Sequence, residues 1–258
     1  MKFAPNTLNL FSGQNIGDQL ASISRSGFEY VEILFPYLYP IEDLKALLQK
    51  NSLKISLMDV LPGDVRNLDI SAACDPARVE EFRGYARLAH HVAETLDVPN
   101  INCISGCTGS VLHADSRQMM DVYRENLRYT CELFAGSGRK VLVEPVSEFQ
   151  FPGYLVRNLN DAAELVEELG CPELFLQFDF FHIQLLHGNL VGNMRTFYDR
   201  IGYFQIANPP GRNQPQVGEI DFSYVLGELA LLGYDGVVGL EYIPSGPDEH
   251  SFSWINTL

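Results

Sequence analysis

Short apolar runs alternate with amphipathic segments along the whole chain. Each run is rich in Val, Ile, Leu and Phe and is bounded by Gly, Pro or polar residues, which is typical of strands buried on both faces of a parallel sheet. The pattern predicts eight strands, at Phe3–Leu8, Phe28–Leu34, Leu53–Met58, Asn100–Ile104, Lys140–Glu144, Leu174–Asp179, Tyr203–Ala207 and Gly236–Glu241.

Apolar residues at helical spacing predict a helix after each strand. Glycines at 27, 170 and 233 are expected to end three of the helices. The predicted helices are Gln14–Ser26, Ile41–Lys50, Arg78–Leu96, Ser116–Phe134, Asn160–Leu169, Leu190–Ile201 and Phe222–Leu232, with Ser251–Ile255 closing the last one.

Strand and helix therefore alternate eight times, with no linker and no break in composition. This alternation predicts an α/β fold, a closed (β/α)8 TIM barrel, and the length favours a single domain over residues 1–258. A doubly wound open sheet is the alternative. It fits less well because no Gly-rich fingerprint follows the first strand.

Oxygen-bearing side chains end four neighbouring predicted strands. They are Glu144, Asp179, Gln205 and Glu241. In such a barrel the carboxyl ends of the strands carry the chemistry. One such acid alone is best explained by a neighbouring Arg or Lys, but four donors together indicate a shared site. Crowded carboxylates stay ionised beside a cation, and an all-oxygen set favours Mg²⁺ or Mn²⁺ over zinc.

Three further side chains are expected near these strand ends. His182 follows Asp179 by three residues and is predicted to contact substrate. Arg212 lies in the loop after the seventh strand, where it could hold a carboxylate or hydroxyls or simply be a surface residue. Glu32 ends the second strand, and a structural ion pair is its expected role.

The composition of the chain limits the kinds of partner that the protein is expected to bind and the compartment in which it is expected to work. The net charge of −15 argues against nucleic acid and anionic membranes, and no apolar run is long enough to span a bilayer. No secretory signal is recognisable at the N-terminus. The five cysteines are odd in number and scattered, which favours reduced thiols and a cytoplasmic location. Cys103 and Cys107 are expected to be such thiols rather than metal ligands.

The chemistry that remains is a metal with paired glutamates. There is no nucleophile elbow and no P-loop, and Lys54 and Lys140 begin strands, at the wrong end for a Schiff base. Such a site is suited to removing a proton next to a carbonyl.

Several motifs, taken together, resemble the hydroxypyruvate isomerase family of xylose isomerase-like barrels. They cover nearly the whole chain: Val-Glu144-Pro, Gln177-Phe-Asp179-x-x-His182, His187-Gly-Asn-Leu, Gln205-Ile-Ala, Pro209-x-Gly-Arg212-x-x-Pro, Gly218-Glu-Ile and Gly239-Leu-Glu241-Tyr. The resemblance implies interconversion of hydroxypyruvate and tartronate semialdehyde through an enediolate. It implies Glu144 and Glu241 as the proton-handling pair, and these two with Asp179 and Gln205 as metal ligands. His182 and Arg212 are implied substrate contacts.

Three segments depart from the family pattern: residues 65–78, Ser147-Glu148 and Ile243. All are expected near the mouth, so they bear on which substrate is bound and leave the metal ligands intact. Loss of a polar group at position 243 points to a less acidic substrate unless Arg66 supplies the missing charge. Arg66 is therefore included among the predicted substrate-binding residues.

The alternatives to this isomerase are a ketose 3-epimerase or a 2-oxo-tetronate isomerase on the same scaffold. Gln205, where such epimerases usually have His, favours the isomerase. A catalytically silent metabolite-binding barrel is the non-enzyme alternative, and a nuclease is disfavoured by the acidic charge. The exact substrate, the preferred cation and the oligomeric state, a homo-oligomer included, stay open.

Overall fold

Eight parallel strands form the framework of the protein. The computed structural model describes residues 1–257 of the 258. In one sheet the strands follow the order β1-β8-β7-β6-β5-β4-β3-β2. Their bounds are β1 Lys2–Pro5, β2 Tyr30–Glu32, β3 Lys54–Asp59, β4 Asn100–Asn102, β5 Lys140–Val143, β6 Leu174–Asp179, β7 Ile201–Ile206 and β8 Val237–Leu240.

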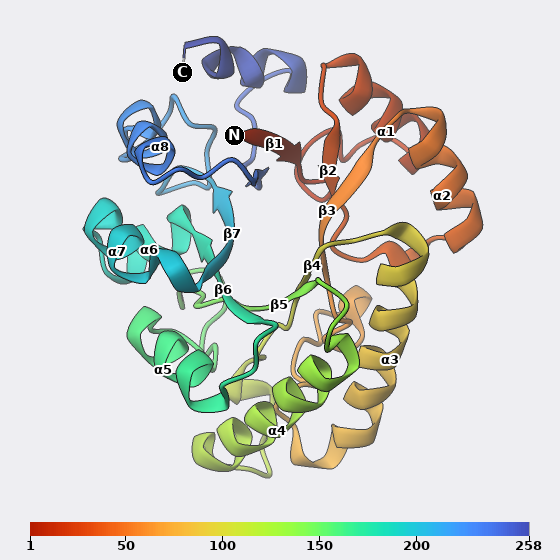
Figure 1. Cartoon of the computed structure of the whole chain (residues 1–258), viewed down its shortest axis with the longest axis vertical. Helices are drawn as coiled ribbons and strands as arrows, with labels where there is room; N and C mark the ends of the chain where they lie inside the picture. The colour runs from red at the N-terminus through yellow and green to blue at the C-terminus, as the bar shows by residue number, and fades with distance from the viewer. Residues whose placement is uncertain (258) are drawn as a thin grey trace. The chain divides into compact units, whose positions relative to one another are not determined.

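The two strands at the ends of this order, β1 and β2, are themselves joined. Asn6 and Glu32 form a parallel bridge, and the Thr7 amide donates to the Glu32 carbonyl at 3.0 Å. Strands β1 and β2 lie side by side in Figure 1. On the other side of β1, Lys2 pairs with Val237 of β8. The sheet thus closes on itself, so the predicted (β/α)8 barrel is confirmed and the open doubly wound sheet is wrong.

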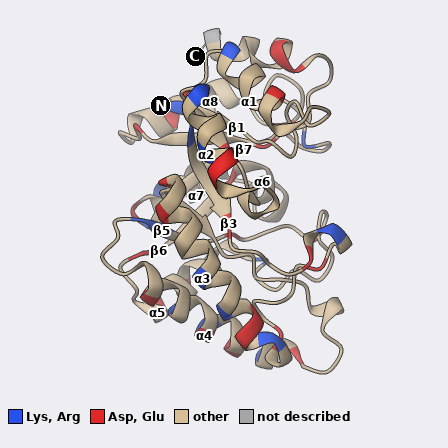
Figure 2. Cartoon of the chain, turned by 90° about the vertical axis from the view of Figure 1, so that its right-hand side faces the viewer, with Lys and Arg blue, Asp and Glu red and all other residues tan. Residues whose placement is uncertain are grey.

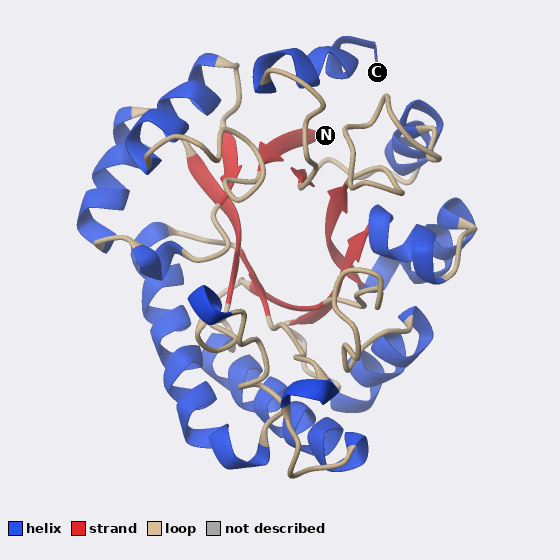
Figure 3. Cartoon of the chain, turned by 180° about the vertical axis from the view of Figure 1, so that it is seen from behind, coloured by secondary structure: helices blue, strands red, loops and turns tan. Residues whose placement is uncertain are grey.

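The chain divides into two compact units. One comprises Met1–Ser56, Phe178–Asp199 and Tyr203–Leu258, and the other Leu57–Gln177 and Arg200–Gly202. In each unit the helices lie along one face of its strands (Figure 3). The expectation of a single domain over residues 1–258 stays a prediction.

The helices confirm most of the predicted pattern. Helices α2 and α4 and strand β6 have the predicted bounds. The helices are α1 Ile16–Arg25, α2 Ile41–Lys50, α3 Val79–Leu96, α4 Ser116–Phe134, α5 Leu159–Leu169, α6 Phe180–Leu186, α7 Leu190–Phe197 and α8 Phe222–Leu231, and 3₁₀ turns include η2 Val65–Asn67, η5 Tyr198–Arg200 and η6 Asp248–Thr257.

Local chemistry explains where several helices begin and end. Asp115 and Gln118 form a capping box at the start of α4, with side chain and backbone satisfied reciprocally. Gly27, Gly170 and Gly233 all have positive φ just beyond α1, α5 and α8, as expected for C-terminal glycines.

Helix α6 was not predicted. Only one helix, Leu190–Ile201, was expected between the sixth and seventh strands. The segment instead contains α6, α7 and η5, and Ile201 already begins β7. Helix α6 has seven residues, and its first four are buried, so it shows no amphipathic pattern. This error matters, because α6 carries His182.

An aromatic cluster packs the first unit around the beginning of α6. The Phe180 ring stacks on Phe204 of β7 at 5.7 Å and meets the edges of Phe178 and Phe222 at 5.1 and 6.1 Å. All four side chains are buried. Burial of such rings stabilises the fold by roughly 2 kcal/mol each, and it fixes the first turn of α6 against the sheet.

In the second unit α3 and α4 lie side by side (Figure 1). Charged residues of both signs are interspersed along these helices (Figure 2), and Arg124 contacts both Asp121 and Glu168.

Lys140 begins β5, and its Nζ donates to the Gly202 carbonyl at 3.1 Å, so it lies at the amino end of the strand as predicted. Among residues 1–257, none of the helices has the length and apolarity that crossing a membrane requires.

Candidate active site

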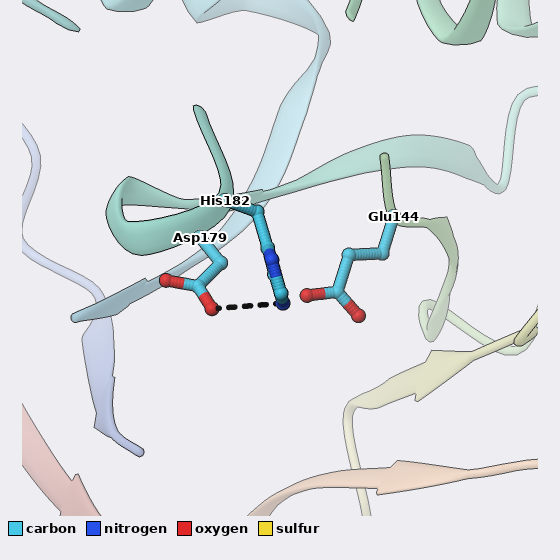
Figure 4. Close-up of side chains that lie close together, drawn as sticks. All are labelled: Glu144, Asp179 and His182. Carbon is cyan, nitrogen blue, oxygen red and sulfur yellow. Dashed lines mark ion pairs between the residues drawn. The ribbon is translucent and has the colours of Figure 1, made fainter. Parts of the chain in front are cut away.

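Asp179 and His182 are held together by the junction of β6 and α6. Asp179 is the last residue of β6 and also the N-cap of α6, where its Oδ1 accepts from the Phe181 amide at 2.9 Å. His182 follows in the first turn of that helix, and its Nε2 lies 3.6 Å from Asp179 Oδ2 (Figure 4). Both side chains are buried. The spacing Asp-x-x-His thus follows from an N-cap and one helical turn.

Arg212 joins these residues to Glu241. Its Nη2 lies 3.1 Å from Asp179 Oδ2 and 2.9 Å from Glu241 Oε2, and its Nε donates to the Glu241 carbonyl at 2.9 Å. Its guanidinium also lies over the Phe181 ring, 5.0 Å from the centroid. Arg212 is therefore a buried cation shared by two carboxylates and not a surface residue.

The loop after β7 explains how Arg212 reaches this position. Asn208 and Asn213 exchange two backbone hydrogen bonds of 2.8 and 2.7 Å, which fold the loop back on itself. The Asn208 side chain also donates to the Pro215 and Ile220 carbonyls. Arg212 has a φ of 55°. This left-handed conformation costs a non-glycine residue about 1 kcal/mol, and such strain is frequent at functional sites.

The charge state of the cluster follows from its burial. Burial is the main cause that raises the pKa of Asp179 to about 7, while Arg212 opposes the rise and Glu241 adds to it. Burial, aided by the charge of Arg212, lowers the pKa of His182 well below its usual value. His182 is therefore neutral at pH 7.

Arg212 also identifies the tautomer of His182. Arg212 Nη1 lies 3.3 Å from His182 Nε2, and a guanidinium can only donate, so Nε2 is the acceptor and Nδ1 carries the proton. The close approach drawn as a dashed line in Figure 4 is thus between a carboxylate and a neutral imidazole, not between two charges.

Glu144 belongs to the second unit. It directly follows β5, and Asn102 of β4 donates from Nδ2 to its Oε2 at 3.1 Å. Strand β5 pairs in parallel with β6, with Val143 opposite Leu176. Glu144 thus lies directly after the carboxyl end of β5, and Asp179 is the last residue of β6. Each side chain in Figure 4 offers an atom that a metal could take, a carboxylate oxygen in Glu144 and Asp179 and a ring nitrogen in His182.

Gln205 lies one strand away from Glu241. Gln205 of β7 is opposite Gly239 of β8, and Glu241 comes two residues later, where its amide donates to the Ile206 carbonyl at 3.2 Å. Gln205 is fully buried, and its Nε2 is 3.2 Å from both carboxylate oxygens of Glu32. The first unit therefore brings Asp179, His182, Arg212 and Glu241 into direct contact and turns Gln205 toward Glu32.

The ion pair expected for Glu32 is wrong. Its carboxylate accepts from the side chains of Asn6, at 2.8 Å, and Gln205, and no Lys or Arg among residues 1–257 pairs with it. Burial raises the pKa of Glu32 to about 8, and the charge of Glu241 contributes, although hydrogen bonds from Asn6, Tyr203 and Gln205 oppose the rise.

This raised pKa gives a stability prediction. The folded protein binds a proton at Glu32 between about pH 5 and 8, where an unfolded Glu has lost it, so stability should fall as pH rises through this window. One proton corresponds to about 1.4 kcal/mol per pH unit. Urea unfolding of wild type and E32Q at pH 5.5, 6.5 and 7.5 should show a smaller decrease in E32Q. D97N, at an exposed carboxylate, should keep the wild-type slope. Equal slopes in E32Q and wild type would exclude this role of Glu32.

The three departures from the family pattern lie in loops. Arg66 is exposed in η2, in the second unit. Glu148 forms an exposed ion pair with Arg157 at 2.7 Å. The Ile243 side chain is 54% exposed, and its amide donates to the Arg212 carbonyl at 2.7 Å. Ile243 thus supports the loop of Arg212 through its backbone, which any residue except proline could do. The role of Arg66 stays a prediction.

Sequence reasoning missed three polar residues that contact the predicted ones. Asn6 and Tyr203 bond to Glu32, and Asn102 bonds to Glu144. A signal was available for the two asparagines, because each interrupts or ends an apolar strand. Tyr203 gave none, since an aromatic residue is ordinary in a strand.

Comparisons with known proteins agree with this geometry. The family model of the xylose isomerase-like TIM barrel matches residues 20–258. Hydroxypyruvate isomerase of Escherichia coli (strain K12) is 33% identical over 99% of this chain and 98% of its own. A 2-oxo-tetronate isomerase of Pectobacterium atrosepticum is 33% identical over 98% and 96%. The crystal structure of an AP endonuclease, family 2, from Brucella melitensis superposes with a TM-score of 0.94 at 30% identity, over 99% of this chain and 98% of that one.

The chain belongs to the xylose isomerase-like TIM barrel family. Its predicted resemblance to hydroxypyruvate isomerases within that family is confirmed by these relatives. It is accordingly an enzyme of the aldose–ketose isomerase class.

Proposed function

We propose that the enzyme isomerises a small hydroxy-oxo acid, of the type that converts hydroxypyruvate to tartronate semialdehyde. The observation that carries this proposal is the single guanidinium of Arg212 shared by Asp179 and Glu241, with neutral His182 beside it. Carboxylates and a fixed cation at the ends of barrel strands are suited to holding an acid and moving one of its protons. The names of the relatives support the substrate class.

We further propose a divalent cation, Mg²⁺ or Mn²⁺, held by Glu144, Asp179, Gln205 and Glu241. The donor set fits such an ion, since it consists of three carboxylates and one amide oxygen. Burial already disfavours the charge on Asp179, so a cation there would lower the pKa of Asp179 and keep it ionised. When bound, the cation would polarise the substrate carbonyl.

The protein's own residues would then move the proton. Glu241 and Glu144 form the proposed pair: one takes a proton from the hydroxymethyl carbon to give an enediolate, and a proton returns to the neighbouring carbon. The hydroxyl proton passes from the oxygen that becomes the aldehyde to the oxygen that becomes the hydroxyl. Arg212, whose guanidinium already contacts Asp179, Glu241 and His182, would attract the substrate carboxylate through its positive charge. His182 is a further proposed substrate contact, as a neutral side chain whose Nε2 faces Arg212. Arg66 is retained as a proposed further substrate contact.

A 2-oxo-tetronate isomerase is the second candidate. Its support is that such an enzyme is as similar to this chain, at 33% identity, as the hydroxypyruvate isomerase is. The reaction moves a proton between adjacent carbons in the same way on a longer acid, so the site described above would serve both. A ketose 3-epimerase and a catalytically silent barrel are outcomes of the test below.

The partner we propose is therefore a small molecule, with no nucleic acid and no membrane, in the cytoplasm. The acidic net charge of −15 supports the exclusion of polyanions. A homo-oligomer is compatible with this proposal.

The test is exchange of substrate α-protons with D₂O, followed by NMR. Hydroxypyruvate, a 2-oxo-tetronate and several free ketoses are offered with Mn²⁺ and then with excess EDTA. We expect exchange into one of the two acids that stops with EDTA and returns with Mn²⁺. Exchange at C3 of a free ketose would establish the epimerase instead. No exchange into any compound would support the silent barrel.

A further inference from the structure

Glu32 carries a buried carboxyl group that the proposed chemistry does not use, and it contacts Gln205. It ends β2, is fully buried, and has amide and hydroxyl partners in place of a cation. Burying a carboxyl without a counter-charge is costly, so its retention calls for a reason. The reason is found in the orientation of its partners.

The position of Glu32 is fixed from the side of Asn6. Asn6 Oδ1 accepts from the Leu8 amide at 2.9 Å, so its NH₂ group is the part that faces Glu32 Oε2, at 2.8 Å. The glycine at 239 then provides the space, because a Cβ there would lie 1.8 Å from Glu32 Oε1. Asn6 and Gly239 thus hold the carboxylate at one place inside the first unit.

Gln205 is the third partner, and its orientation follows. Its Nε2 lies 3.2 Å from both carboxyl oxygens of Glu32 and donates to them, so the amide presents its NH₂ group to Glu32. The carbonyl oxygen of Gln205 then faces away from Glu32. A carbonyl oxygen can bind a cation or accept a hydrogen bond, whereas an NH₂ group would repel a cation.

We propose that Glu32 is a positioning residue that fixes the Gln205 side-chain amide with its carbonyl oxygen directed away from β2, toward the ligand set of the site. The use of that oxygen as a cation ligand rests on the proposed function, but its orientation by Glu32 does not. Outer-shell partners of this kind typically change metal affinity 10–100-fold when they are replaced.

The test uses a swapped pair of side chains. In E32Q the Asn6 NH₂ keeps the new amide oxygen, so an NH₂ group replaces one of the two oxygens that accept from Gln205. Two NH₂ groups then face each other, and we expect the Gln205 amide to turn over. Q205E instead places two carboxylates together. In the double variant E32Q/Q205E the amide at position 32 donates to the carboxylate at position 205, and an oxygen again faces the site. The work is done at pH 8.5, above the pKa of about 8 of the wild-type Glu32 carboxyl.

Two readouts are measured. Mn²⁺ affinity is determined from the EPR signal of free Mn²⁺, and we expect about a 10-fold or greater loss in each single variant and recovery to within about 3-fold of wild type in the double variant. The NMR resonances of the Gln205 side-chain NH₂ group are assigned as those that are present in the wild-type spectrum and absent from the spectrum of Q205E. In wild type they should exchange slowly with solvent, and in E32Q they should shift and exchange faster.

Unchanged Gln205 resonances in folded E32Q would overturn the proposal, as would additive losses of Mn²⁺ affinity in the double variant. If E32Q does not fold, by circular dichroism, the comparison of Q205E with the double variant decides. If wild type binds no Mn²⁺, the proposed cation site fails, and the NMR result alone decides whether Glu32 orients Gln205.

Discussion

Replacing Glu241 with Gln is expected to lower metal-dependent proton exchange into the substrate by about 10²–10⁴-fold. An amide has the shape of the carboxyl group but cannot take a proton at neutral pH. Its oxygen can still accept from Arg212, which lies 2.9 Å from Glu241 Oε2, so the fold should persist. The loss should therefore fall on kcat, measured by NMR exchange in D₂O.

The matched control is E249Q, at an exposed glutamate in η6 outside the cluster. It should exchange at the wild-type rate. If E241Q kept more than about a tenth of the wild-type rate, well above the range expected for loss of a general base, Glu241 would not be the group that moves the proton. Glu144→Gln would then be the next variant to compare.

Replacing Arg212 with Met is expected to destabilise the cation-free protein by about 3 kcal/mol, because it leaves two carboxylates without their shared partner. Asp179 is buried, and Arg212 is the main cause that opposes the rise of its pKa, so that pKa should increase further. The measurement is the free energy of unfolding in urea, with EDTA present.

Adding Mn²⁺ or Mg²⁺ should restore part of this loss, since a cation at the same carboxylates stabilises the folded state by mass action. R157M removes an exposed ion pair with Glu148 and should change stability by less than about 1 kcal/mol. Wild-type stability of R212M in EDTA would show that the shared guanidinium does not hold these carboxylates in the fold.

An element of the fold could be predicted from the sequence where the capping residues and the hydrophobic pattern indicated the same boundaries. Helix α4 has the predicted bounds because the capping box at Asp115 coincides with the start of a long amphipathic pattern. Helix α6 could not be found by periodicity, because the first four of its seven residues are buried. Its N-cap, Asp179, was interpreted only as a strand-end ligand, although an Asp before an apolar run also indicates a helix start.

The site could be predicted only where strand ends define it. The parallel pattern placed Asp179, Gln205 and Glu241 at the ends of β6, β7 and β8, and the structure has them in or directly after these strands. The position of Arg212 depends on the backbone bridges between Asn208 and Asn213, which have no periodic signal. The partners of Glu32 depend on space at Gly239, which becomes evident only when strands are paired.

The closure of the sheet between β1 and β8 has a consequence for synthesis of the chain. Lys2 of β1 pairs with Val237 of β8, so β1 cannot complete its pairing until β8 has been synthesised. Contacts this distant in sequence form slowly, because a long loop must close before they form. A nascent chain stopped before β8 has an unpaired edge at β1, and exposed edges invite pairing with other chains. Emergence of β8 from the ribosome is thus the step that allows this edge to be covered.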